Sequence, residues 1–219
     1  MNAPTPVTEQ DTRAGRQIEH SSFAIVDAEA GSHSYAEDQW QVVRRMIHAT
    51  ADFEFNGLAR FHDTAMQAGI EAVKAGAPII SDVEMIRVGL SKARLGHFGI
   101  TAHQFINDGD VTSKAKEEDT TRAIQAMRKA RDVGLMDGAI VGVGNAPTAL
   151  LEVIRQVQEG EAKPALIIGM PVGFVSAAES KAELEQLQEV PWMLTHGRKG
   201  GSTMVVAAIH ALFSLCTQS

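Results

Sequence analysis

Cysteine is almost absent from this sequence: Cys216 is the single one among 219 residues. A lone cysteine cannot close a disulfide within the chain or build a thiolate metal cluster, so a reducing cytoplasm is the expected compartment. Long apolar runs are absent as well, because no stretch approaches the roughly 18 residues that a membrane-spanning helix requires. The sequence therefore predicts a cytoplasmic protein with no membrane partner.

An excess of basic residues is also lacking. The chain has 20 Lys and Arg against 27 Asp and Glu, which gives a net charge of -7. Binding to nucleic acid usually needs a concentrated basic surface, so we expect no nucleic-acid partner. Apolar side chains, in contrast, make up 44% of the residues, which is enough for a substantial core.

The amino terminus shows no export signal, since it lacks a basic start followed by an apolar core. Its composition, MNAPTPVTEQDT, is typical of a chain end with no fold of its own. We therefore expect a mobile tail over residues 1–15 and a single domain over residues 16–219.

Apolar periodicity divides that domain into a helical start and an alternating remainder. Helical spacing predicts helices over residues 16–30, 35–51 and 64–74, the last of them ended by Gly76. Beyond Gly76, helical patterns such as the one over 111–132 alternate with short β-rich runs at 77–82, 100–108, 138–144, 164–170 and 191–197. Such alternation predicts an α/β fold, in which helices cover both faces of a mainly parallel sheet.

Ligands of such folds bind where the loops leave the carboxyl ends of the strands. The first informative loop, GVGNAPTALL (142–151), has Asn145 as a helix cap and Pro147 in the first turn of the next helix. It matches no nucleotide motif, because it lacks the Gly-Lys-Ser/Thr of a P-loop and has Pro147 where a dinucleotide fingerprint needs glycine. A structural turn and a ligand loop both remain open.

The second loop, GMPVGFVSAAESK (169–181), places Gly173 in irregular backbone after a buried strand. One interpretation is a ligand loop. The other makes Ser176 a helix cap and Glu179 its capping-box partner.

The third loop, HGRKGGSTM (196–204), combines Arg198 and Lys199 with two glycines and with Ser202 at a helix start. Exposed amides, the helix dipole and two cations predict a site for carboxylate or phosphate. A solvated basic turn is the alternative.

His48 stands out within RRMIHATADFEF (44–55). Helical spacing places it on one face with Arg44, Arg45 and Asp52, whose opposite influences would leave an imidazole able to exchange a proton near neutral pH. A packing role is the alternative. No metal site is expected, because His97 and His103, the nearest candidates, have a spacing that fits no usual metal pair.

Five segments follow one another between about Gln17 and Leu212: RRMIHATADF, GAPIISDVEM, VGNAPTALL, GMPVGFVSAAESK and GRKGGS. In this combination the chain resembles the precorrin-8X methylmutase family of cobalamin (vitamin B12) biosynthesis. The resemblance implies a flavodoxin-like three-layer fold, a homodimer with active sites near the subunit interface, and no cofactor. It also implies an isomerase that moves a methyl group from carbon 11 to carbon 12 of a tetrapyrrole, giving hydrogenobyrinic or cobyrinic acid.

The resemblance also assigns roles to residues. The catalytic histidine of the family follows an R-x-[IV]-H pattern and falls on His48, while Arg45 and Ser22 match residues that contact the substrate. The substrate is a planar ring fringed with carboxylates, which suits an apolar cleft rimmed by cations and helix amino termini. We therefore expect further substrate contacts at Asn145, Gly173, Arg198, Lys199 and Ser202.

The sequence also bears on the choice of substrate and on two alternative functions. The segment HATADFEF and Lys199 favour the branch of the family whose substrate already contains cobalt. A tetrapyrrole carrier without catalysis would need the same basic cleft but no positioned acid. A flavin or nucleotide protein of similar fold is disfavoured by the missing phosphate motifs.

Overall fold

The computed structural model describes residues 7–10 and 12–217. The helices of this part of the chain are α1 (Arg13–Glu29), α2 (Glu37–Thr50), α3 (Phe55–Leu58), α4 (Ala65–Lys74), α5 (Glu84–Gly89), α6 (Lys92–Phe98), α7 (Gly109–Glu117), α8 (Arg122–Asp132), α9 (Pro147–Gln158), α10 (Ala177–Gln186) and α11 (Ser202–Thr217). The strands are β1 (Ala59–Phe61), β2 (Ile79–Ser81), β3 (Ala102–His103), β4 (Ile140–Val143), β5 (Leu166–Gly169) and β6 (Trp192–Thr195).

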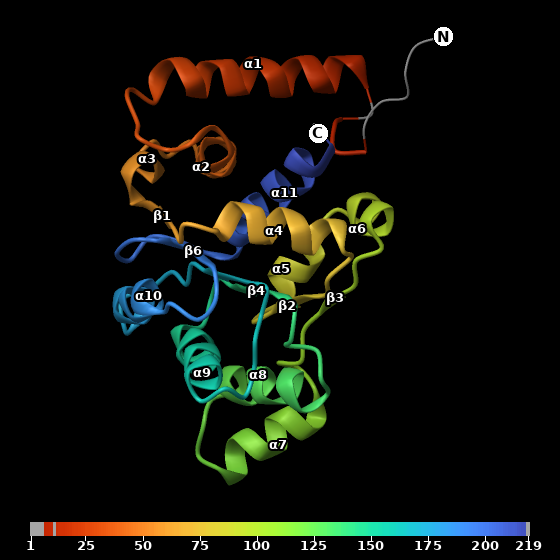
Figure 1. The fold of residues 1–219 in the computed structure, drawn as a ribbon, viewed down its shortest axis with the longest axis vertical. Helices are drawn as coiled ribbons and strands as arrows, with labels where there is room; N and C mark the ends of the chain where they lie inside the picture. The colour runs from red at the N-terminus through yellow and green to blue at the C-terminus, as the bar shows by residue number, and fades with distance from the viewer. Residues whose placement is uncertain (1–6, 11, 218–219) are drawn as a thin grey trace.

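The six strands form one sheet in the order β1-β6-β5-β4-β2-β3 (Figure 1). All neighbours pair in parallel except β1, which runs antiparallel along β6. Numbered among themselves, the five parallel strands follow the order 2-1-3-4-5 of flavodoxin-like folds. The expected three-layer α/β architecture is therefore confirmed.

Each face of the sheet has a core of its own, because alternate residues of a strand point to opposite faces. Ile79, Ile140 and Ile168 belong to the core under α2, α4, α5 and α11. Their neighbours Ile80 and Val141 belong to the core under α8, α9 and α10. Buried aliphatic residues on both faces explain why the strands read as continuous apolar runs rather than as alternating patterns.

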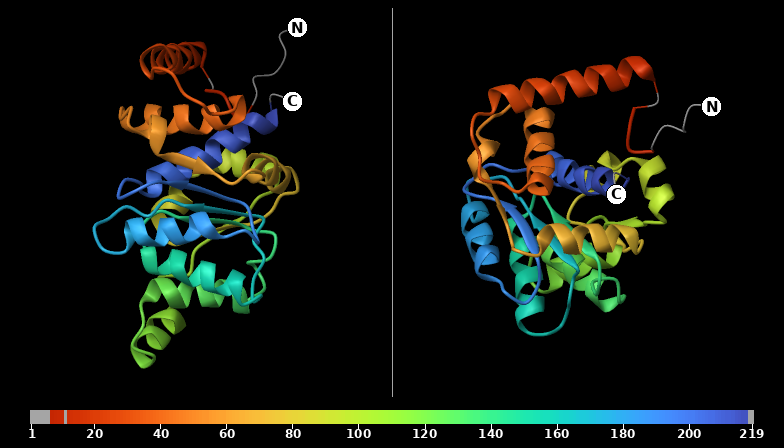
Figure 2. Two further views of the ribbon diagram at one scale, coloured as in Figure 1. Left: turned by 60° about the vertical axis from the view of Figure 1, so that its left-hand side comes forward. Right: turned by 45° about the horizontal axis from the view of Figure 1, so that its top comes forward.

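Helices α1 and α2 add an outer layer on one side. Helix α2 packs along α11, and α1 lies across α2 at the margin of the molecule (Figure 2). The Trp40 indole donates to the Asp27 carboxylate at 2.8 Å, which joins α2 to α1. His48 lies in the last turn of α2 and so belongs to this outer layer.

The structure bears on the expected amino-terminal tail in part. Residues 1–6 and 11 lie outside the described residues, so the division between tail and domain stays a prediction. Residues 7–10 form a turn whose Thr8 side chain is buried, and α1 begins at Arg13 rather than at residue 16.

Two predicted elements differ from the structure. The run at 100–108 contributes only the two-residue strand β3. The helix predicted over 111–132 is two helices, because Asp119 takes a left-handed φ of 51° and Thr121 starts a new helix by accepting from the Ile124 amide at 3.2 Å. Strand β1, which was not predicted, is only three residues long.

The buried carboxyl group of Asp82 joins the loops after β2 and β4, the two neighbouring strands between which the strand order of the sheet reverses. Asp82 follows β2 and accepts hydrogen bonds from the amides of Gly144, Asn145 and Ala146 at 3.0, 2.9 and 2.7 Å, at the start of α9. Burial raises the pKa of this carboxyl group, and the three amides oppose that rise. The expected cap at Asn145 is wrong: the N-cap is Ala146, and Asp82 serves these amides from another strand.

We expect Asp82→Ala to lower the free energy of unfolding by at least about 2 kcal/mol, because three amides at a helix start lose their shared acceptor. Urea unfolding measures the change. Asp82→Asn keeps one oxygen acceptor and should lose less. An alanine variant within about 0.5 kcal/mol of the parent protein would contradict this account.

Candidate functional site

His48 is exposed, and its ring centroid lies 5.0 Å from that of Phe23 on α1. Helix α2 ends two residues later, because Ala51 adopts a left-handed conformation with φ 54°. The expectation that Asp52 continues the helical face of His48 is therefore wrong. The imidazole instead faces the gap between α1 and α2.

The two arginines before His48 have separate partners. Arg44 donates to Asp27 at 2.9 Å, and its guanidinium lies 4.5 Å from the Phe23 ring. Arg45 forms an ion pair with Glu19 at 3.4 Å. Burial lowers the pKa of Arg45, and the Glu19 charge opposes that shift. Residues of α1 therefore hold both guanidinium groups in place.

Two hollows of different character meet at His48. One, of about 200 Å³, is lined by Ser22 and by the apolar side chains of Ile25, Val26, Ile47 and Phe53. The other, of about 360 Å³, which we call the cationic hollow, is lined by Arg45 and Arg94 together with Ser91, His210 and two acids, Glu9 and Glu19, that are each paired with an arginine. An imidazole between an apolar and a cationic hollow suits a ligand with a flat apolar body and acidic arms.

The three glycine-rich loops meet at one edge of the sheet, as predicted. The Gly201 amide donates to the Met170 carbonyl at 2.8 Å, and the Gly173 amide donates to the Arg198 carbonyl at 3.2 Å. The buried Lys181 ammonium donates to the Lys199 carbonyl at 2.7 Å, and burial lowers the pKa of Lys181 to about 8. The loops after β5 and β6 are thereby fixed to each other.

Lys199 connects this edge to the end of α2. Its ammonium forms ion pairs with Asp52 and, at 2.9 Å, with Glu54, both just beyond the last turn of α2. These hydrogen bonds raise the pKa of Lys199, and they lower that of Asp52. The loop after β6 is thus linked to the segment that follows His48.

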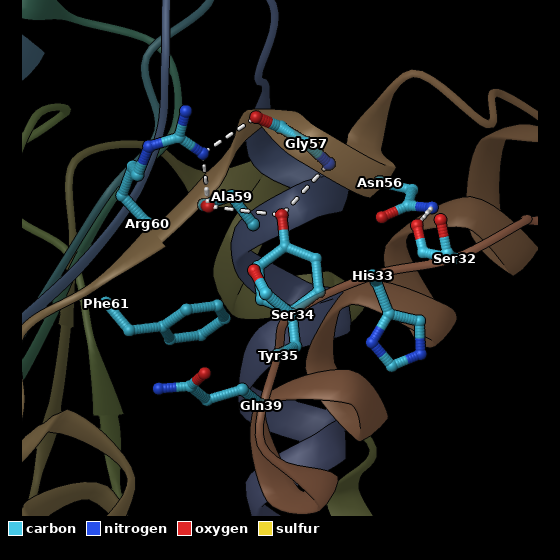
Figure 3. Close-up of a pocket in the computed structure, with 10 residues that line it drawn as sticks. All are labelled: Ser32, His33, Ser34, Tyr35, Gln39, Asn56, Gly57, Ala59, Arg60 and Phe61. Atoms are coloured by element: carbon cyan, nitrogen blue, oxygen red, sulfur yellow. Dashed lines mark hydrogen bonds between the residues drawn. The ribbon is translucent and has the colours of Figure 1, made fainter.

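A larger hollow, of about 700 Å³, lies between the α1–α2 connection and β1 and includes no predicted site residue among those lining it (Figure 3). The Tyr35 hydroxyl there donates to the Ala59 carbonyl at 3.2 Å and accepts from the Gly57 amide at 2.9 Å. Arg60 donates to the carbonyls of Gly57 and Ala59. These polar groups bind one another, so size alone does not make this hollow the functional site.

Comparison with known proteins identifies the family. The family model described as precorrin-8X methylmutase matches residues 17–215. The chain belongs to this family. It is 48% identical to the cobalt-precorrin-8 methylmutase of Leptospira interrogans, over 95% of this chain and 97% of that protein, and 50% identical to the one of Priestia megaterium, over 90% and 86%. A crystal structure of precorrin-8X methylmutase from Thermus thermophilus matches with a TM-score of 0.88 and 52% identity, covering 93% of this chain and 97% of that one.

Membership confirms the resemblance drawn from the motifs and, with it, an isomerase of cobalamin biosynthesis. The same finding favours a methylmutase over a tetrapyrrole carrier or a flavin protein. In the described part of the chain, no His, Cys, Asp and Glu side chains gather in a group of three that could hold a metal ion.

The predicted site residues of this methylmutase fall into two groups. Ser22, Arg45 and His48 lie together around the two hollows. Asn145, Gly173, Arg198, Lys199 and Ser202 lie at the sheet edge.

Within the second group, exposure differs. Ser202 is buried, and an added Cβ on Gly144 would lie 2.6 Å from its Cα. The guanidinium of Arg198 lies 5.5 Å from the ring of Phe174, which is 84% exposed. Ser176 is the N-cap residue of α10, but it has a left-handed φ of 59° and its side chain makes no capping hydrogen bond. The capping box with Glu179, one of the two interpretations of this loop, is therefore not formed.

Sequence reasoning missed two residues of the cationic hollow, Arg94 and His210. His210 lies on an apolar helix, and its Nε2 accepts from the Ser91 amide at 3.2 Å, which requires a neutral ring. Burial, with the charges of Arg94 and Arg45, lowers the pKa of His210 to about 3. An imidazole flanked by apolar residues was the available signal, but it is equally typical of packing.

The pKa of His210 makes stability depend on pH. In the folded protein the ring stays neutral down to about pH 3, whereas in the unfolded chain it gains a proton near pH 6.5. This contribution to stability is therefore complete above pH 6.5 and is lost as the pH falls toward 3, by up to about 1.4 kcal/mol per pH unit. We expect His210→Gln, which keeps an acceptor for Ser91, to unfold in urea with a shallower loss of stability across this window. If the free energy of unfolding of both proteins falls equally steeply between pH 6.5 and pH 3, His210 does not make this contribution.

Proposed function

We propose that this methylmutase converts cobalt-precorrin-8 into cobyrinic acid by moving the methyl group from carbon 11 to carbon 12. The observation that carries the proposal is the exposed imidazole of His48 between an apolar and a cationic hollow, in a chain of this family. The apolar hollow, with Ser22, suits the face of the macrocycle. The cationic hollow, with Arg45, suits its carboxylate arms.

His48 supplies a proton in this scheme. The imidazole protonates a ring nitrogen or carbon, the methyl group migrates as the ring double bonds come into conjugation, and the proton returns to His48. Product and substrate are isomers, so the ring of His48 ends the cycle in its starting state. The protein also contributes by holding the macrocycle in the migrating geometry.

The sheet edge is the proposed second contact region. Arg198 and the start of α11 at Ser202 suit carboxylates, because helix amino termini and cations attract anions. The amides of Asn145 and Gly173 already donate to Asp82 and to the Arg198 carbonyl, so a carboxylate would have to compete for them. Lys199 is already held by Asp52 and Glu54, so it contributes here chiefly by fixing the loop. A carboxylate would have to compete with those two acids for its ammonium.

The preference for a substrate containing cobalt is supported by HATADFEF and Lys199, and by the names of the Leptospira and Priestia relatives. Cobalt belongs to the substrate in this scheme and needs no ligands from the protein. We also propose the cytoplasm as the compartment, from the single cysteine. None of the helices among the described residues is both long and apolar enough to cross a membrane.

Replacement of His48 tests the proposed chemistry. Loss of a general acid typically costs about 10²- to 10⁴-fold in rate, so His48→Ala should slow turnover of cobalt-precorrin-8 by that order while cobyrinic acid still binds. His103→Gln, on strand β3, is the matched control and should keep the parent rate. If His48→Ala turns over the substrate as fast as the parent enzyme, His48 is not the proton donor. If the parent enzyme turns over metal-free precorrin-8 faster than cobalt-precorrin-8, the proposed preference for cobalt is overturned.

We further propose a homodimer with active sites near the subunit interface. Each hollow beside His48 is open and smaller than a tetrapyrrole with its arms, so one subunit leaves much of the ring uncovered. Exposed apolar side chains on α1 (Ile18, Ile25) and after β5 (Phe174, Val175) offer surfaces for a second copy.

Sedimentation equilibrium checks the dimer. We expect a mass of twice the 23.5 kDa of one chain at micromolar concentration. Phe174→Asp and Ile25→Asp should each lower that mass, because a charge in an apolar interface opposes association. A parent protein that sediments as one chain, with full activity, would rule out the dimer.

A further inference from the structure

Arg94 on α6 is a buried charged group whose hydrogen bonding is incomplete. Its side chain is buried, with 7% of the residue exposed, and it lines the cationic hollow beside His48. Its Nη2 donates to the backbone carbonyl of Thr8 at 2.6 Å. Its Nη1 is buried and has no hydrogen-bond partner among the described residues. A guanidinium can donate in a two-pronged fork, and here one prong is unused.

The charges around Arg94 do not balance. Arg45 faces the same hollow, and Glu19 on α1 pairs with Arg45 at 3.4 Å. Glu9 also lines the hollow but pairs with Arg16 at 3.6 Å, and the His210 ring is neutral. The buried Arg94 and the half-buried Arg45 therefore share one carboxylate, that of Glu19. A buried cation held only by a carbonyl lacks the partner that would offset the cost of leaving water.

The carbonyl that Arg94 binds belongs to the short segment Val7–Gln10, which we call the strap. Its anchors are few. The Thr217 hydroxyl donates to the Ser214 carbonyl at 2.9 Å, so the Thr8 hydroxyl is the donor in its 2.7 Å hydrogen bond to Thr217. Arg16 donates to the Gln10 carbonyl at 2.8 Å. The strap runs between the start of α1 and the end of α11 (Figure 1).

We propose that Arg94, together with Arg45, binds a carboxylate arm of the tetrapyrrole. In the free protein the Thr8 carbonyl of the strap occupies Nη2 of Arg94, and the arriving carboxylate displaces this carbonyl. The inference rests on the proposed function and extends it to a residue and a segment without an assigned role. A carboxylate accepts from Nη1 and Nη2 together, which satisfies the unused prong and adds the missing negative charge. The carbonyl offers one acceptor and no charge, so the exchange favours the arm.

Equilibrium binding of cobyrinic acid and of its fully amidated derivative tests Arg94. Arg94→Gln should raise the Kd for cobyrinic acid about 10- to 100-fold, the range for a charge-assisted pair. The Kd for the amidated ring should stay within about threefold of that of the parent protein. Arg131→Gln, which removes one positive charge from the distant helix α8, should bind both as the parent does. Equal weakening of both ligands in Arg94→Gln would show a structural role and overturn the proposal. If Arg94→Gln does not fold, Arg94→Lys replaces it: this variant keeps the charge and loses the two-pronged donation, so it should weaken the binding of cobyrinic acid less than expected for Arg94→Gln and leave that of the amidated ring unchanged.

The strap is tested by Thr8→Val, which keeps the shape of the side chain and removes its hydrogen bond to Thr217. Displacing the strap should then cost less free energy, so cobyrinic acid should bind about two- to fivefold tighter to this variant. Hydrogen exchange of the peptide containing residues 7–10 should speed up when cobyrinic acid binds the parent protein. Unchanged affinity in Thr8→Val, or a strap that becomes more protected on binding, would overturn the displacement.

The parent protein separates the two levels of inference. If it neither binds cobyrinic acid nor converts cobalt-precorrin-8, the proposed function fails. If it does both while Arg94→Gln binds cobyrinic acid equally well, the function stands and the Arg94 site is refuted.

Discussion

The burial of α11 is the constraint on which the rest of the structure depends. This helix is apolar through most of its length and packs against α2, α4 and α5 as well as the central strands β4 and β5. Most of its surface is therefore unavailable to water, and the helices around it are placed by the need to cover it. Helix α2 is the one that carries His48, so the position of the imidazole follows from how an apolar stripe of α2 fits α11. Two polar residues of α11 lie on the side of the cationic hollow: His210 lines the hollow, and Ser214 accepts a hydrogen bond from Arg45.

Sequence reasoning recovered the architecture because the runs that contain β2, β4, β5 and β6 are apolar and short, which distinguishes them from the helices between them. Residues such as Ile140 and Ile168 are buried on both faces of a parallel sheet, and that environment selects continuous apolar runs. It also named Ser22, Arg45 and His48, which the structure brings together, through a family resemblance rather than through spacing. Strand β1 was missed because its three residues, with the exposed Arg60 at the centre, do not form an apolar run like that of the equally short β2. The break at Asp119 was missed because a left-handed aspartate leaves no mark on an amphipathic pattern.

The remaining omissions share one physical cause: they are contacts between residues far apart in the chain. Asp82 serves amides more than sixty residues away, so the local pattern suggested Asn145 instead. Lys199 was correctly placed in a basic turn, but its pairing with Asp52 spans 147 residues. Arg94 and His210 belong to helices with no motif, and their importance appears only when α6 and α11 approach α1 and α2. Local chemistry identifies candidate groups, whereas the fold decides which of them remain free.

The Asp82 carboxylate has a consequence for what this fold can bind. In flavodoxin-like sheets the crevice at the reversal of strand order is the usual seat of a nucleotide or flavin phosphate, which backbone amides at a helix start receive. Here those amides already hold an anion that is part of the chain and cannot diffuse away. The Asp82 side chain thus takes the place that a phosphate group would need at these amides, and the crevice is closed to such a ligand from within. The proposed site around His48 lies away from this crevice, on the outer helices α1 and α2.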